Sequence, residues 1–161
     1  MFKKILVPLD GSALAEEALP YAEDMARTRQ SEIFLFRVAM TNVTSDAMVS
    51  LEQGNPEYRA YTMEIEQPIV ESVNKYLDTI QHALEQRGLP VHKVIKRDGH
   101  PASAILSFAQ EAGIELIVMS THGRSGLNRL IYGSVTERVL RGTGIPVLVV
   151  PSGGWKSLHR V

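Results

Sequence analysis

Short apolar runs alternate with longer stretches of helical periodicity along this chain. The apolar runs are residues 3–9, 32–38, 91–96, 115–119 and 146–150. Three of them are nearly continuous in aliphatic residues, as is usual for strands buried on both faces. Because strands that alternate with helices are typical of a parallel sheet with helical crossovers, the pattern predicts an α/β fold. The half-polar run at 91–96 is expected at one edge of the sheet.

Four helices are predicted between these strands. The first is expected to begin at the N-cap Ser12 and to kink at Pro20, because an interior proline removes a backbone hydrogen bond. The second has apolar residues at spacings of three and four from residue 65 onwards and is stopped by Gly88. The third is expected to open at Pro101, and the fourth to cover residues 134–141.

Length and composition indicate one ordinary globular domain. We expect it to cover residues 1–151, with a variable loop at 41–63 and a loosely held tail at 152–161. A formal net charge of −1 provides no basic surface for nucleic acid or for an anionic membrane. No apolar run is long enough for a signal peptide or a bilayer span, and there is no cysteine. These features favour a cytoplasmic protein.

A glycine-rich segment follows the fourth predicted strand. Residues 120–126 read Ser-Thr-His-Gly-Arg-Ser-Gly, and Gly133 precedes the last predicted helix. Ligands of open α/β sheets bind outside the carboxyl ends of the strands, where glycines let backbone N–H groups approach an anion. A helix N-terminus adds further N–H groups and a favourable dipole. The segment therefore predicts a phosphate site, with an ordinary turn as the alternative.

Two observations bear on that alternative. Ser134 and Glu137 have the spacing of a capping box, in which Ser134 would serve its own helix, and this role is compatible with ligand binding if a ligand displaces the cap. Neither the P-loop pattern nor the dinucleotide pattern Gly-x-Gly-x-x-Gly occurs in the chain. A nucleotide site here must be of another kind.

Residues 120–134 resemble the signature Gly-x2-Gly-x9-Gly-Ser/Thr of ATP-binding universal stress proteins, with Ser120 in place of the first glycine. Residues 4–12 are similar to that family's first strand and turn, and residues 99–101 and 145–150 are similar to its later segments, so the resemblance covers nearly the whole chain. It implies an open, doubly wound, five-stranded parallel sheet. The implied strand order is Rossmann-like, 3-2-1-4-5, with helices on both faces.

The resemblance also implies a binding site. Pro8 and Asp10 match positions beside adenosine, and Val38 matches the position whose backbone reads the adenine edge. The glycine-rich loop would wrap the ribose and phosphates, and the start of the last helix would donate to the phosphates. The implied binding residues are Pro8, Asp10, Val38, Ser120, Thr121, His122, Gly123, Arg124, Ser125, Gly126, Gly133, Ser134, Val135 and Thr136. For Asp10 the alternative is that its carboxylate accepts hydrogen bonds from its own turn.

The function implied by the resemblance is a regulatory ATP-binding module of the stress response. AMP and ADP are alternative ligands, and Mg²⁺ or Mn²⁺ would accompany the phosphates. The apolar strand at 146–150 is expected to form a homodimer edge to edge, unless the tail covers it. A weak ATPase or nucleotidyl-transfer enzyme is the competing function. Its candidate catalytic bases are Asp10, His122 and Glu137, and for each of them a structural role is the simpler interpretation. The histidines have no paired spacing, so no protein metal site is predicted.

Overall fold

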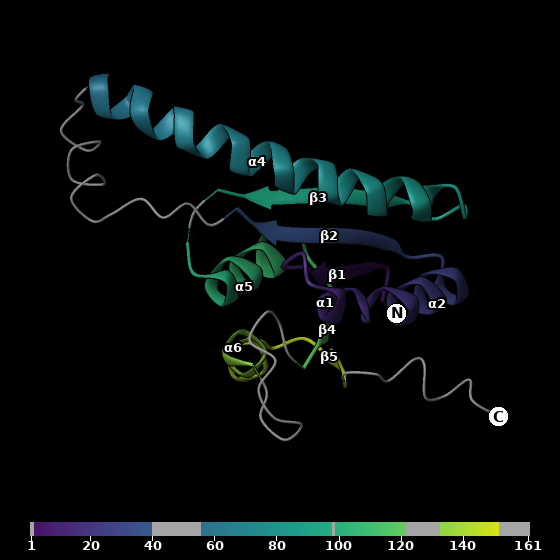
Figure 1. Ribbon diagram of the computed structural model, residues 1–161. Helices are drawn as coiled ribbons and strands as arrows, with labels where there is room; N and C mark the ends of the chain where they lie inside the picture. Colours follow the sequence, from purple (N-terminus) through teal and green to yellow (C-terminus); the bar gives the residue numbers. More distant parts are fainter. Residues whose placement is uncertain (1, 40–55, 98, 122–132, 152–161) are drawn as a thin grey trace.

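The strands of this protein form a single parallel sheet. The computed structural model describes residues 2–39, 56–97, 99–121 and 133–151. Within them the strand order is β3-β2-β1-β4-β5, and every neighbouring pair is parallel (Figure 1). The strands are β1 Lys4–Pro8, β2 Glu32–Val38, β3 Val91–Lys96, β4 Leu116–Ser120 and β5 Val147–Val150. The predicted fold class and strand order are confirmed.

Helices cover both faces of the sheet (Figure 1). They are α1 Ala13–Glu16, α2 Leu19–Arg29, α4 Pro56–Glu85, α5 Pro101–Glu111 and α6 Ser134–Gly142. The first three pack against one face, and α5 and α6 pack against the other. Among the described residues, no helix has the combined length and apolar character needed to cross a lipid bilayer.

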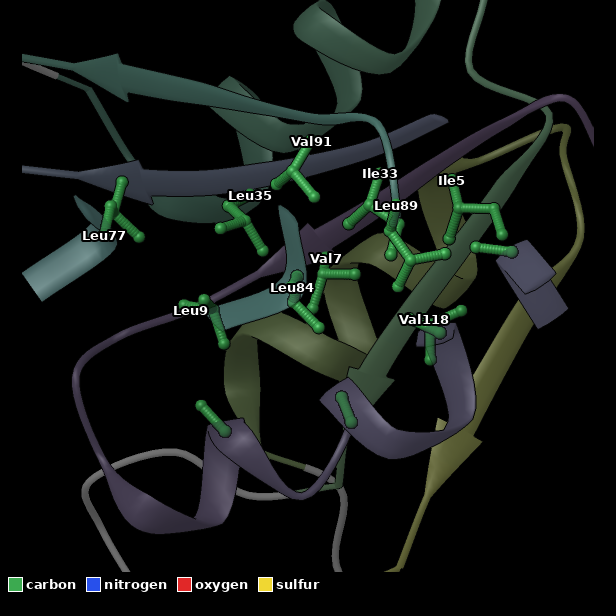
Figure 2. Close-up of a cluster of buried hydrophobic side chains, with 14 of the residues drawn as sticks. Ile5, Val7, Leu9, Ile33, Leu35, Leu77, Leu84, Leu89, Val91 and Val118 are labelled. Atoms are coloured by element: carbon green, nitrogen blue, oxygen red, sulfur yellow. The ribbon is translucent and has the colours of Figure 1, made fainter. Parts of the chain in front are cut away.

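The core under α1, α2 and α4 is built from alternate strand residues. Ile5 and Val7 of β1 and Ile33 and Leu35 of β2 are fully buried there, together with Leu77 of α4 (Figure 2). Successive residues of a strand point to opposite faces, so a period of two places these side chains on one face. Each such aliphatic side chain contributes about 2 kcal/mol by leaving water.

The intervening strand residues build the second core, under α5 and α6. Leu6, Phe36 and Ile117 meet Ile105 of α5 and Val139 of α6, and all five are almost inaccessible to solvent. Because both faces of the central strands are covered, these strands are apolar at nearly every position. This explains the continuous apolar runs in the sequence.

The first predicted helix is two helices. Its N-cap is as expected, because Ser12 Oγ accepts a hydrogen bond from the Ala15 N–H at 3.1 Å. The helix then stops at Glu16, and α2 restarts at Leu19. Pro20 therefore lies in the first turn of a new helix, where the missing N–H leaves no hydrogen bond unmade, and the predicted kink is wrong.

The helix α4 is longer than predicted. It begins at Pro56, so residues 56–63 of the expected variable loop are helical. Proline suits a first helical position, and the residues after it include glutamate, arginine, alanine and methionine, which favour helix without an apolar period. Residues 41–55 of that loop and the expected tail at 152–161 lie outside the described residues.

Candidate functional site

A pocket of about 290 Å³ opens at the carboxyl edge of the sheet. It lies where β1 has β2 on one side and β4 on the other, which is the switch point at which open α/β sheets bind ligands. Its walls come from the ends of β1, β2 and β4 and from the starts of α1, α5 and α6. The lining residues are Pro8, Leu9, Asp10, Ala15, Phe36, Arg37, Val38, Pro101, Ile105, Met119, Ser120, Gly133, Ser134, Val135 and Thr136.

The fold brings together most of the predicted site residues that the structure describes. The ones that line the pocket are Pro8, Asp10, Val38, Ser120, Gly133, Ser134, Val135 and Thr136. Thr121 follows β4 directly and is half-buried, but it does not line the pocket. The remaining predicted residues, His122, Gly123, Arg124, Ser125 and Gly126, lie outside the described part of the chain.

Asp10 organises the turn between β1 and α1. Its Oδ1 accepts hydrogen bonds from the Ser12 N–H at 2.9 Å and from the Ser12 hydroxyl at 2.6 Å. Gly11 has φ +83°, a left-handed conformation that glycine adopts without strain. The carboxylate therefore holds its own turn, as the plainer interpretation predicted, and it also lines the pocket.

The start of α6 differs from the predicted capping box. Gly133 is the N-cap, Ser134 is the first helical residue, and no side chain of the described residues caps the helix. Glu137 instead accepts a hydrogen bond from Arg141 Nε at 3.1 Å, one helical turn further on. The box fails because the Gly133 N–H donates to the Thr121 carbonyl at 2.7 Å and so fixes the helix start at Gly133. Ser134 is exposed and does not cap its own helix.

This helix start offers backbone donors to the pocket. The N–H groups of Ser134, Val135 and Thr136 belong to the first turn of α6 and have no acceptor within the helix. All three residues line the pocket. A helix N-terminus carries about half a unit of positive charge, so this wall favours an anion.

The side chain of Thr136 faces the protein interior. Its hydroxyl donates to the Ser120 carbonyl at 3.0 Å, and both residues are buried. Because that hydroxyl hydrogen is already used, Thr136 can donate to a ligand only through its backbone.

Several pocket residues were not predicted from the sequence. Phe36, Ile105 and Met119 add apolar surface, and Arg37 adds a cation. The guanidinium of Arg37 lies 4.8 Å from the centre of the Tyr76 ring. The position of these residues in the sequence could have identified them. In a parallel sheet every strand ends at the same edge, so the residues that end β2 and β4 must meet there.

A sequence profile described as the Universal stress protein family matches residues 1–151. The chain belongs to the universal stress protein family. The resemblance drawn from its motifs is thereby confirmed. Universal stress protein MJ0531 of Methanocaldococcus jannaschii is 33% identical over 150 residues, which cover 93% of this chain and 82% of that protein. Universal stress protein YxiE of Bacillus subtilis is 31% identical, over 93% of this chain and 99% of its own length.

Solved structures agree with this assignment. The structure of the hypothetical protein MJ0577, solved to assign its biochemical function, has a TM-score of 0.70 and 29% identity; the match covers 93% of this chain and 96% of that one. A universal stress protein in complex with cAMP has a TM-score of 0.58 over 93% of this chain and 97% of its own. At 18% identity, the second likeness shows a shared fold alone.

Proposed function

We propose that this universal stress protein binds an adenine nucleotide, ATP in the first place, in the pocket at the carboxyl edge of the sheet. The observation that carries the proposal is the start of α6, whose first N–H groups have no acceptor within the helix and border the same pocket as Asp10 and Val38. In this account binding regulates the protein's part in the stress response. AMP and ADP are the alternative ligands.

The inner part of the pocket suits a nucleoside. Phe36, Ile105 and Met119 supply apolar surface against which a purine ring can pack. The Val38 backbone, at the end of β2, is available to the base edge, and Asp10 lies where a ribose hydroxyl would be recognised.

The α6 side of the pocket suits phosphates. Ser134 is exposed at the first helical position, so its hydroxyl and its N–H are both available to a phosphate oxygen. Among the described residues, no group of three or more histidine, aspartate or glutamate side chains could hold a metal ion. Mg²⁺ or Mn²⁺ would therefore arrive with the phosphates, and calorimetry with and without EDTA tests this.

The proposed role is binding without efficient hydrolysis. Asp10 is the one carboxylate among the described lining residues, and its Oδ1 is occupied by Ser12. A carboxylate held in this way is a poor candidate for the group that activates a nucleophile at the γ-phosphate. Phosphate release from ATP at the level of a buffer control is the expected result.

We also propose that two copies pair through β5. This strand is an edge of the sheet, and its residues Val147, Leu148 and Val149 remain partly exposed. Leu140 of α6 is an exposed large apolar residue, with 37% of its surface accessible. Unpaired apolar edges favour association across a two-fold axis. Size-exclusion chromatography with light scattering at micromolar concentration should give a dimer, and a monomer would contradict this part.

Substitution of Ser134 tests the nucleotide site directly. In Ser134→Glu, the helix dipole stabilises the negative charge at the first turn, but that charge repels phosphates. We expect calorimetry to show at least about tenfold weaker ATP binding with an unchanged melting temperature. Ser134→Gln is the matched control, because it has the same size without the charge, and it should retain most of the affinity. Adenosine should bind both variants equally.

Two results would end the proposal. One is a ligand-free wild-type protein that shows no heat of binding and no protection from unfolding at millimolar ATP, ADP or AMP. The other is a Ser134→Glu variant that binds ATP as tightly as Ser134→Gln does, because phosphates would then lie elsewhere. Mass spectrometry of small molecules released from the purified protein provides an independent check on the ligand.

A further inference from the structure

The end of β4 and the start of α6 are joined by two hydrogen bonds. The Gly133 N–H donates to the Thr121 carbonyl at 2.7 Å, and the Thr136 hydroxyl donates to the Ser120 carbonyl at 3.0 Å. The second bond is deeply buried, with Thr136 only 3% and Ser120 only 7% exposed. It is therefore shielded from water that could replace it.

The hydrogen bond from Thr136 lies at a level of β4 that its pairing with β1 does not reach. β4 pairs with β1 only at Leu116 and Ile117, whereas its pairing with β5 continues to Ser120. β1 therefore supplies no ladder partner at the level of Ser120. Buried carbonyls are stabilised by hydrogen-bond donors, and the Thr136 hydroxyl supplies one to the Ser120 carbonyl at the end of the strand.

The same bond fixes the first turn of α6. Thr136 is the third residue of that helix, directly after Ser134 and Val135, whose N–H groups have no acceptor within it. Threonine is branched at Cβ and has few rotamers, so a bond from its hydroxyl restrains the backbone that carries it. The position of the helix start relative to β4 is thus set by a side chain that does not face solvent.

We propose that Thr136 is a positioning residue for the anion-binding end of the pocket: its hydroxyl, anchored on the Ser120 carbonyl, aligns the N–H groups of Ser134 and Val135 for a phosphate. The inference rests on the proposed nucleotide function. It adds a role for a side chain that touches the strand end and not the ligand. A residue of this kind affects the phosphate part of a ligand more than its nucleoside part.

The test compares Thr136→Val with Thr136→Ser in the full-length protein. Valine keeps the shape of threonine and removes the hydroxyl, whereas serine keeps the hydroxyl. Calorimetry well below the melting temperature should show about tenfold weaker ATP binding for Thr136→Val and a value within about twofold of wild type for Thr136→Ser. Adenosine should bind all three proteins alike. If the valine variant does not fold by circular dichroism, Thr136→Ala replaces it in the same comparison.

Ser31→Ala is the matched control for loss of stability alone. Ser31 is fully buried, and its hydroxyl also donates to a backbone carbonyl, that of Phe2. That bond lies before β1 and β2, at the opposite end of the sheet from the pocket. We expect Ser31→Ala to lower the melting temperature and to leave the affinity for ATP unchanged.

The outcomes distinguish a failure of the positioning role from a failure of the proposed function. If wild type binds ATP and Thr136→Val binds it equally well, the positioning role is overturned and the proposed function stands. Equal losses of ATP and adenosine affinity, or an equal loss of ATP affinity in Ser31→Ala, would overturn it as well, because the effect would then be general destabilisation. A wild-type protein that binds no ATP overturns both proposals.

Discussion

The guanidinium of Arg37 lies over the ring of Tyr76, 4.8 Å from its centroid. This contact joins the carboxyl end of β2, where the pocket is, to the long helix α4. The cation also lies on the β1–α1 turn, since a Cβ placed on Gly11 would be 2.8 Å from one of its nitrogens. Among the described residues, the Tyr76 hydroxyl is buried without a hydrogen-bond partner.

The unpartnered hydroxyl predicts that Tyr76→Phe stabilises the protein. The variant keeps the ring under Arg37 and removes a buried hydroxyl that has no hydrogen-bond partner in the described part of the chain, so the free energy of unfolding should rise by about 1 kcal/mol. Urea denaturation measures the change. Tyr76→Leu is the control, because it also removes the ring and should be less stable than wild type. A loss of stability in Tyr76→Phe would show that the hydroxyl has a partner in solution.

The same residue predicts a dependence on alkaline pH. Burial, followed by the interaction with the nearby Glu16 carboxylate, raises the pKa of Tyr76 above its ordinary value of 10. A raised pKa in the folded state stabilises the protein fully below the unfolded pKa, and this contribution is lost as the pH rises through the folded value. Wild type should therefore lose stability above pH 10 relative to Tyr76→Phe, as measured by urea denaturation at successive pH values. If the free energies of unfolding of the two proteins changed in parallel with pH, the raised pKa of Tyr76 would be contradicted.

Gly11 is predicted to be essential to the turn that carries Asp10. Its φ of +83° and the nearby Arg37 guanidinium both oppose a side chain. Gly11→Ala should cost about 1–2 kcal/mol of unfolding free energy and weaken ATP binding. Gly144→Ala is the matched control, because nothing lies within 4 Å of a Cβ there. Thermal denaturation compares the two variants, and equal melting temperatures would refute the prediction.

Glu23 is predicted to stabilise the contact between α2 and the end of α4 in a pH-dependent way. Its carboxylate accepts hydrogen bonds from Arg27 at 2.9 Å and from Arg87 at 2.6 Å, and its side chain is only 17% exposed. Burial raises the pKa of Glu23, but the hydrogen bonds from both arginines outweigh it and hold that pKa below its ordinary value. The resulting stability is present above the unfolded pKa and is lost as the pH falls through the folded value.

Glu23→Gln should therefore cost about 1 kcal/mol at neutral pH, since the arginines are half-exposed and solvent screens them. The difference from wild type should vanish in acid. Glu71→Gln, at an exposed position of α4, is the control and should change stability little at any pH. A deficit of Glu23→Gln that persists at low pH would mean that packing, and not charge, is responsible.

The sequence predicted the sheet well because its signals are local. Apolar runs place strands such as β4 without knowledge of their neighbours, and Ser12 predicted the cap of α1 from its own side chain. The role of Pro20 was predicted wrongly because a proline is compatible either with a kink or with the start of a new helix, and packing decides between them. The start of α4 at Pro56 was missed because its first residues have helix propensity but no apolar period.

The site was only partly predictable for a different reason. The Ser134–Glu137 spacing fits a capping box, but the bond between Gly133 and Thr121 starts the helix elsewhere. The Thr136–Ser120 bond depends on where β1 stops pairing with β4, which no local pattern encodes. Such features arise from the register of distant segments and become visible only in three dimensions.

A crystal structure of this protein grown with saturating ATP is the most direct test of the nucleotide site. It should show the base against Val38, the ribose beside Asp10, and phosphate oxygens accepting hydrogen bonds from the N–H groups of Ser134 and Val135. A pocket without nucleotide at saturating ATP, or ATP bound elsewhere with the start of α6 in contact only with solvent, would contradict the account.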